Sequence, residues 1–244
     1  MRVSVTSATA LLSCTVLFVV SPACSQTRPA SQSRPATATR PAGAGDHNFA
    51  RWEKDIAAYE AMDRTAPPPK GGVLFIGSST IRLWKTLDKD FPDQQVINRG
   101  FGGSEIVDST HFAERIIFPY RPRMIVLRAG GNDIHAGKSP QRVFEDYKAF
   151  AAKVHARLPK AVIVYISTNP TPARWSERDA TKTLNASIEK YTRRRPYLKY
   201  VETWDMVLAP DGQPLSNLFA PDRLHFSVEG YRLLAERVRP LLAK

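Results

Sequence analysis

The residues best suited to catalysis are a serine, a histidine and an aspartate, which lie in two short clusters far apart in the sequence. Ser79 follows Gly77 and Ser78, and Asp222 stands three residues before His225. A hydroxyl, an imidazole that takes its proton and a carboxylate that orients the imidazole are the parts of a nucleophilic acyl-transfer site. We therefore predict that Ser79 is the nucleophile, His225 the base and Asp222 its orienting partner.

Two glycine-rich clusters lie between them and offer donors for an oxyanion. Gly103 ends the run Gly-Phe-Gly-Gly, and Asn132 follows Gly-Gly. Without a Cβ, Gly103 would let the backbone approach a substrate, and an exposed Asn132 amide would donate beside it. The N–H of Ser79 is expected as a third donor. Both clusters could instead be plain turns, which favour glycine and asparagine. Asn98 is expected to hold the glycine loop, and Asp133 to brace rather than react.

The elements that must position these residues follow from the apolar runs. The first three clusters follow strand-like runs at 73–76, 96–97 and 124–127, which lack polar alternation. Such runs predict a parallel sheet covered on both faces, with ligands bound beyond the carboxyl ends of its strands. Further strands are expected at 162–166 and about 199–203, and helices at 49–62, after Ser104, from Ser139 to about 158, from Ser176 to 194 and from Ser227 to 242. Ser139, Ser176 and Ser227 are the expected N-caps of the last three helices.

In their order and flanks, the four clusters resemble those of the SGNH hydrolases, also called GDSL-type esterases and lipases. The resemblance covers Phe49 to the C-terminus and implies an α/β fold, a three-layer α/β/α sandwich with a central parallel five-stranded sheet (the flavodoxin-like SGNH fold). It places Ser79, Asp222 and His225 at the family's triad, and Gly103 and Asn132 at its oxyanion hole. One departure is that Ser78 replaces the usual aspartate of Gly-Asp-Ser. No Gly-x-Ser-x-Gly elbow occurs, which disfavours the α/β-hydrolase fold.

The resemblance leaves the substrate open, since family members act on lysophospholipids, thioesters, short acyl esters and acetylated sugars. No long apolar lid segment is present, so we expect short acyl or sugar-acetyl esters. A lysophospholipase or thioesterase is the alternative enzyme, and a non-catalytic polysaccharide-binding module is the alternative of another class. Arg174 and Trp175 are candidate pocket residues, although a packed loop tryptophan is an equal reading. No cofactor is expected, and no metal-binding motif occurs.

The N-terminal part of the chain has the features of an export signal followed by a linker. An apolar run before Cys24 predicts a signal peptide over residues 1–25. The stretch 26–48 is rich in Pro, Ala and Arg and is expected to be a disordered tether. The hydrolase domain is expected over residues 49–244. Cys24 is an alternative lipid-attachment site, so the expected location is periplasmic, extracellular or the outer surface. The net charge of +12 is scattered, with its densest run at 193–195, and predicts no nucleic-acid partner. The oligomeric state is left open.

Overall fold

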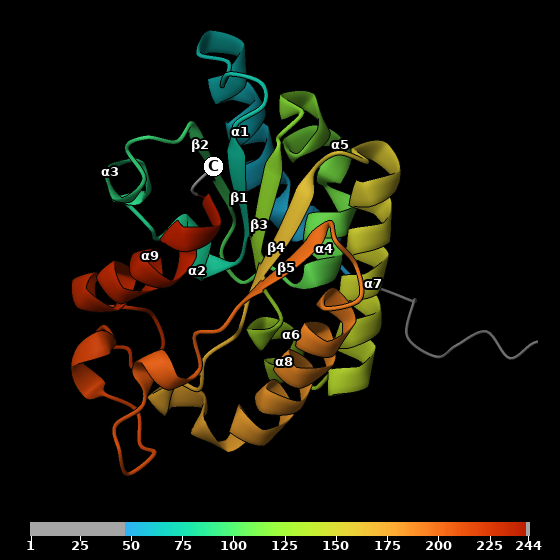
Figure 1. The fold of residues 1–244 in the computed structure, drawn as a ribbon. Coiled ribbons are helices and arrows are strands. Elements are labelled where there is room, and N and C mark those ends of the chain that lie inside the picture. The colour runs from blue at the N-terminus through green and yellow to red at the C-terminus, as the bar shows by residue number, and fades with distance from the viewer. Residues whose placement is uncertain (1–46, 243–244) are drawn as a thin grey trace, which may run out of the picture. The chain divides into compact units, whose positions relative to one another are not determined.

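The computed structural model describes residues 47–242 of the 244-residue chain, so the predicted signal peptide and residues 26–46 of the predicted tether lie outside the described residues. Strands and helices alternate along the described part (Figure 1). The strands are β1 (Val73–Gly77), β2 (Val96–Gly100), β3 (Met124–Arg128), β4 (Val162–Ile166) and β5 (Leu198–Val201). The helices are α1 (Glu53–Thr65), α2 (Ser79–Arg82), α3 (Leu87–Asp90), α4 (Ile106–His111), α5 (Ala113–Ile116), α6 (Gly131–His135), α7 (Pro140–Arg157), α8 (Arg178–Thr192) and α9 (Val228–Leu242).

The five strands form one parallel sheet in the order β2-β1-β3-β4-β5. This is the flavodoxin-like order, in which the direction of adding successive strands to the sheet reverses between β1 and β3, and ligands bind at that switch point. The predicted fold class is therefore confirmed.

The sheet is covered on both faces because alternate strand residues point in opposite directions. Leu74 and Ile125 pack on one face with apolar residues of α1, α4, α5, α7 and α8. Phe75 and Val126 pack on the other with α2, α3 and α9. Figure 1 shows α9 and α3 on one side of the sheet and α7 on the other. Both faces of the sheet are buried, which explains why the strands show no polar alternation.

Two of the three predicted helix caps are confirmed. The hydroxyl of Ser139 accepts the backbone N–H of Arg142 at 3.2 Å, with proline at the first position of α7. The hydroxyl of Ser227 likewise accepts the N–H of Gly230 at 3.2 Å ahead of α9. The predicted cap at Ser176 is wrong. That residue lies inside a 3₁₀ helix, Pro172–Glu177, because Pro172 starts a turn earlier than the serine does, and α8 begins only at Arg178 without a side-chain cap.

The remaining boundary differences are small and lie at element ends. The first predicted helix divides into a 3₁₀ turn, Phe49–Trp52, and α1, which continues to Thr65. Strand β5 begins one residue earlier than expected and ends at Val201. These differences, of one to three residues, lie where helix and strand ends fray.

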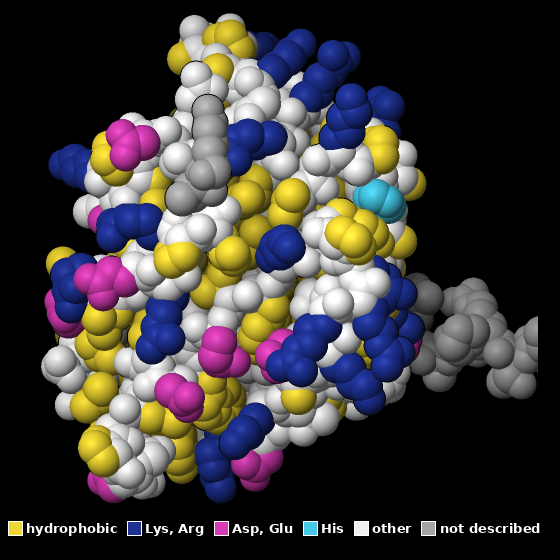
Figure 2. All heavy atoms as spheres, viewed as in Figure 1, with side chains coloured by type: hydrophobic (Ala, Val, Ile, Leu, Met, Phe, Trp, Pro, Cys, Tyr) yellow, Lys and Arg dark blue, Asp and Glu magenta, His cyan; other side chains and the backbone are white. Residues whose placement is uncertain are grey.

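Charged side chains are spread over the surface with one local gathering. Figure 2 shows Lys and Arg side chains scattered among white and yellow areas, with a denser group toward the right of this face. The run 193–195 directly follows α8, where cations favourably meet the helix dipole. Arg193 pairs with Glu189 at 2.6 Å, and Arg195 stacks over Tyr191. Within residues 47–242, no helix is long and apolar enough to cross a membrane.

Candidate active site

Ser79 is placed by a close approach between the ends of β1 and β3. Gly77 has φ of +135°, and a Cβ there would lie 2.0 Å from the carbonyl oxygen of Arg128, so only glycine fits. The N–H of Ser78 donates to the same carbonyl at 3.1 Å. Ser79 then opens α2, where its N–H has no intrahelical acceptor. The hydroxyl and a free backbone donor of Ser79 are thereby held at the carboxyl edge of the sheet.

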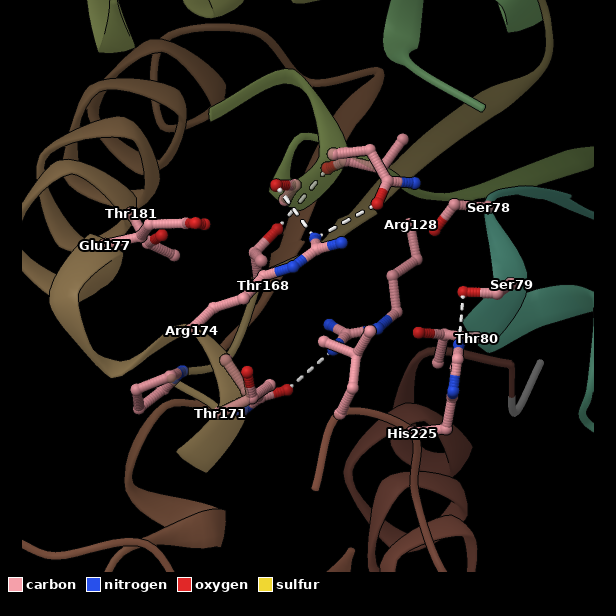
Figure 3. Close-up of a pocket in the computed structure, with 16 residues that line it drawn as sticks. Ser78, Ser79, Thr80, Arg128, Thr168, Thr171, Arg174, Glu177, Thr181 and His225 are labelled. Atoms are coloured by element: carbon pink, nitrogen blue, oxygen red, sulfur yellow. Dashed lines mark hydrogen bonds between the residues drawn. The ribbon is translucent and has the colours of Figure 1, made fainter. Parts of the chain in front are cut away.

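His225 reaches Ser79 from a loop 146 residues further along the chain. Its Nε2 lies 2.9 Å from Ser79 Oγ, and its Nδ1 lies 2.6 Å from Asp222 Oδ2 (Figure 3 marks the first contact). An Nδ1–H that donates to the carboxylate leaves Nε2 as the acceptor of the serine proton. The three side chains therefore form one hydrogen-bonded line.

The aspartate is oriented by the backbone of its own loop. Its Oδ1 accepts the N–H groups of Leu224 and His225, each at 3.0 Å, so that Oδ2 faces the imidazole. A short bridge between Phe219 and Phe226 closes this loop at its base. The hydrogen bond from His225, helped by these two backbone N–H groups, lowers the pKa of Asp222 to about 2. The carboxylate is therefore ionised throughout the neutral range.

The glycine loop after β2 is fixed on both sides. Asn98 donates to the Ile81 carbonyl at 2.7 Å and accepts the Gly100 N–H at 3.0 Å, which confirms its predicted holding role. The indole of Trp52 donates to the Gly102 carbonyl at 2.9 Å. Gly103 follows in the left-handed region, with φ of +76°. Sequence reasoning missed Trp52, because nothing in its helical spacing distinguishes it from an ordinary core residue.

Asn132 lies in α6, with its amide held from two directions. Nδ2 donates to the Ser104 carbonyl at 3.0 Å, which uses one of its two hydrogens. Oδ1 accepts Arg174 Nη1 at 3.0 Å, and the same nitrogen donates to the Gly131 carbonyl at 3.2 Å. The guanidinium has only donors, so it fixes which end of the amide is the oxygen. A second Nδ2 hydrogen stays available beside the Ser104 carbonyl.

Ser79 and His225 stand where a small pocket meets a more open groove; the first, the more enclosed of the two, is called the enclosed pocket below. The pocket has a volume of about 70 Å³ and runs from Ser79 toward the loop after β4 (Figure 3). Besides Ser79 and His225, most of the residues that line it have polar side chains: Ser78, Thr80, Arg128, Asn132, Thr168, Asn169, Thr171, Arg174, Glu177 and Thr181. The groove is wider, about 440 Å³, and is lined by Asp55, Arg82, Gly102, Gly103, Asn132, Arg174 and Leu224.

The structure separates the two predicted pocket residues. Arg174 lines both the enclosed pocket and the groove. Trp175 lies in a neighbouring hollow with Pro172, Pro214 and Phe219, away from Ser79. Arg128, which sequence reasoning missed, lines the enclosed pocket instead. Its signal was present in the sequence, as an arginine at the end of an otherwise apolar strand.

Asp133, next to Asn132, stabilises the site through a buried contact between two helices. Its side chain is fully buried and accepts the Ile106 N–H at 3.2 Å, with Lys138 Nζ 3.8 Å away. Burial raises the pKa of Asp133 to about 7. The side chain ties the start of α4 to α6, and thus links the two loops that carry Gly103 and Asn132.

The other four histidines have structural partners away from Ser79. His47 pairs with Asp108, His135 pairs with Glu177, His111 stacks on Phe49 and His155 stacks on Tyr197. Within residues 47–242, no group of three His, Cys, Asp or Glu side chains could hold a metal ion.

Comparison with known proteins assigns the family. Residues 77–233 match the sequence profile of the GDSL-like Lipase/Acylhydrolase family. No curated protein sequence gives a significant match. The fold and this match define an ester-bond hydrolase. The chain belongs to the GDSL-like lipase/acylhydrolase family.

Solved structures share the fold at low sequence identity. A Streptococcus pneumoniae protein superposes with a TM-score of 0.70 at 19% identity, over 80% of this chain and 94% of that one. A GDSL-like lipase from Bacteroides thetaiotaomicron gives 0.65 at 21%, over 80% and 97%. A variant of an acetyl-xylooligosaccharide esterase from Geobacillus gives 0.52 at 17%, over 72% and 97%.

Proposed function

We propose that this protein is a serine esterase that removes small acyl groups from a larger alcohol through an acyl-enzyme. The observation that carries the proposal is the line of contacts from Ser79 Oγ to His225 Nε2, at 2.9 Å, and from Nδ1 to Asp222, at 2.6 Å. Both distances are within hydrogen-bonding reach without any rearrangement. Gly-Ser-Ser therefore serves here as a nucleophile motif, with Ser79 rather than Ser78 as the reacting residue.

In the proposed mechanism, Ser79 Oγ attacks the ester carbonyl while His225 Nε2 takes its proton. The carbonyl oxygen, now negative, is held by the N–H groups of Ser79 and Gly103 and by the second Nδ2 hydrogen of Asn132. His225 then protonates the departing alcohol. Water, deprotonated by the same imidazole, hydrolyses the acyl-enzyme and frees the carboxylic acid.

The two hollows beside Ser79 support a small acyl group and a large alcohol. A pocket of about 70 Å³ is about half the size of an engineered cavity of ~150 Å³ that holds benzene, so it takes an acyl group with about three or four heavy atoms beyond its carbonyl. The open groove can hold an alcohol of any length, such as an acylated carbohydrate. We therefore favour short acyl or sugar-acetyl esters over lysophospholipids and thioesters of long acids. A solved relative of the same fold is itself an acetyl-xylooligosaccharide esterase.

We also propose that the enzyme acts outside the cytoplasm, on the strength of the signal-like residues 1–25. Cys24 would anchor the mature chain to a membrane if it becomes lipidated. Mass spectrometry of the N-terminus, after fractionation of the producing cells, distinguishes cleavage before residue 26 from a lipid on Cys24. An unprocessed chain in the cytoplasm would contradict the proposal.

Two neighbouring serines give a matched test of the catalytic assignment. Hydrolysis of 4-nitrophenyl acetate is measured for the unaltered enzyme, Ser79→Ala and Ser78→Ala. We expect Ser79→Ala to lose hydrolysis altogether and Ser78→Ala to retain most of it, while circular dichroism reports folded protein in both. Full activity in Ser79→Ala would reject the proposed mechanism. An unaltered protein that binds polysaccharide but cleaves no ester would favour the non-catalytic binding module.

A further inference from the structure

Arg128, the last residue of β3, places an unbalanced positive charge in the enclosed pocket. Only two arginines within residues 47–242 are buried, Arg99 and Arg128, at 5% and 6% exposure. Arg99 forms an ion pair with Asp63. Among the described residues, no carboxylate lies within ion-pair distance of Arg128, which forms none of the ion pairs of this part of the chain. It donates to the Ser167 carbonyl and, at 2.8 Å, to the side-chain oxygen of Asn169, both of which are neutral.

The Arg128 guanidinium is also short of hydrogen-bond partners. Its Nε is buried and finds no acceptor in the part of the chain that the structure describes. Burial lowers the pKa of Arg128 to about 10, so the side chain is still protonated at neutral pH. The ring of Phe226, 5.4 Å from the guanidinium carbon, is the nearest further compensation. A buried cation without an anionic partner costs free energy, which an incoming anion would recover.

A second arginine makes the pocket more positive. Arg174 lines it too, and the acceptors that Arg174 uses, the Gly131 carbonyl and Asn132 Oδ1, are neutral. Glu177 is the one acidic residue in the lining. Its carboxylate acts electrostatically on Arg174 and lies 2.6 Å from the ring of His135, so Arg128 is the cation of this pocket that it leaves without a partner. Figure 3 shows the Arg128 side chain extending toward the loop that carries Thr171.

The shape of the site decides which part of a substrate meets this charge. The pocket has only about 70 Å³ of room, so only the end of a molecule enters it, whereas the adjoining groove is more open and has about 440 Å³. Under the proposed mechanism the small end is the acyl group. An acyl chain with a single methylene between the ester carbonyl and a carboxylate has four heavy atoms beyond that carbonyl, which matches the room available.

We propose that the enclosed pocket is a carboxylate subsite, in which Arg128 selects hemi-esters of short dicarboxylic acids, such as malonyl esters, over neutral acyl groups of the same shape. The inference rests on the proposed function, because it assumes that Ser79 receives the acyl group. Arg128 acts in it as a binding residue for the far end of the acyl chain. Neutral acetyl groups also fit the pocket, but they do not neutralise the positive charge of Arg128.

The test uses a pair of substrates that differ in charge and not in shape. Monoethyl malonate and ethyl 3-methylbutanoate carry acyl groups with the same branching, and ethanol release gives kcat/KM for each. The ratio of acidic to neutral kcat/KM is compared between enzymes, so the intrinsic reactivities of the two esters cancel. We expect Arg128→Met to lower this ratio about 10- to 100-fold, the loss typical of a buried charged hydrogen bond. Arg128→Lys keeps the positive charge and should therefore keep part of the preference for the acidic ester.

Arg99→Met is the matched control, because it removes the other buried arginine at a distance from the pocket. Its ratio should equal that of the unaltered enzyme. An unchanged ratio in Arg128→Met, or an equal fall in Arg99→Met, would overturn the carboxylate subsite. If the unaltered enzyme cleaves 4-nitrophenyl acetate but not monoethyl malonate, the carboxylate subsite is overturned; if it cleaves none of the three esters, the proposed function itself is rejected.

Two further measurements keep the test decisive if Arg128→Met does not fold. Malonate should inhibit the unaltered enzyme at lower concentration than 3-methylbutanoate, which has the same shape with one carboxylate fewer; equal inhibition would overturn the proposal. The acetyl ester of glycolate, compared with ethyl acetate, carries the carboxylate on the alcohol side instead. A preference for this acetyl ester without one for malonyl would place the anion in the groove and overturn the acyl-side assignment.

Discussion

Arg174 donates from Nη1 to Asn132 Oδ1 at 3.0 Å, and this bond determines how the asparagine faces the site. The acceptor end of the amide is turned to the guanidinium, so the donor end is turned to the Ser104 carbonyl and to the space beside Gly103. An amide in the opposite orientation would present its oxygen, an acceptor, to a developing oxyanion. Arg174 is thus a positioning residue for Asn132 in addition to a lining residue of the pocket.

The first prediction compares the amide with the residue that orients it. Asn132→Ala should lower kcat by about 10²–10³-fold, the usual loss of one oxyanion donor. Arg174→Ala should cost less, about tenfold in kcat, because the amide remains but is then held only through the Ser104 carbonyl. In the double variant the two losses should not multiply, since Arg174 has nothing left to orient. Fully multiplicative losses would mean that Arg174 acts independently of Asn132.

The second prediction concerns Asp222, whose role depends on charge rather than size. Asp222→Asn keeps the shape but puts an amide where the carboxylate now accepts from His225. By analogy with a serine-protease triad, kcat on an aryl ester should fall by about 10⁴-fold. The backbone bonds from Leu224 and His225 to the retained oxygen should preserve the loop, so the thermal midpoint is the control. A loss below tenfold would show that the aspartate does not orient the base.

How far the sequence predicts this site depends on whether a residue is tied to a regular element. Ser79 and Asn132 directly follow strand-like runs, and parallel strands bring their carboxyl ends to one edge, so their nearness follows from the pattern. Ser176 shows the limit: its cap was predicted from residue type, but the 3₁₀ turn that begins at Pro172 displaces it.

The contacts of Arg174 and Arg128 could not be predicted in the same way. Arg174 stands in an irregular segment, where spacing does not indicate which neighbour a long side chain will meet. Arg128 continues an apolar strand, and its lack of an anionic partner depends on every element packed around it. Sequence pattern places backbones, whereas the pairing of long charged side chains is decided by tertiary packing.

The third prediction follows from the buried carboxyl of Asp133. Its pKa in the folded protein is about 7, above the ordinary value of 3.8, so the folded state holds a proton that the unfolded state has lost between these two values. Stability therefore falls as pH rises through this window. Asp133→Asn cannot ionise and should gain stability relative to the unaltered protein, by about 1 kcal/mol or more, between pH 5 and pH 8.

Denaturant unfolding of both proteins at the two pH values measures that difference. Every other titrating group is shared, so the comparison isolates Asp133. The asparagine keeps an oxygen for the Ile106 N–H, which should preserve the link between α4 and α6. If the unaltered protein instead gained stability over Asp133→Asn at pH 8, the carboxylate would be ionised and favourably paired with Lys138 in the fold.

The last prediction concerns acyl chain length among neutral esters. The enclosed pocket is small, and Thr168, Asn169 and Thr171 line it toward the β4 loop with polar groups. A long alkyl chain gains about 0.8 kcal/mol per methylene only where apolar surface receives it. Catalytic efficiency on 4-nitrophenyl esters should therefore peak between acetyl and butyryl and decline by octanoyl, and acetylated sugars should be deacetylated. A series from acetyl to palmitoyl decides this, because efficiency that rises to palmitoyl would reveal an apolar tunnel and favour lysophospholipids as substrates.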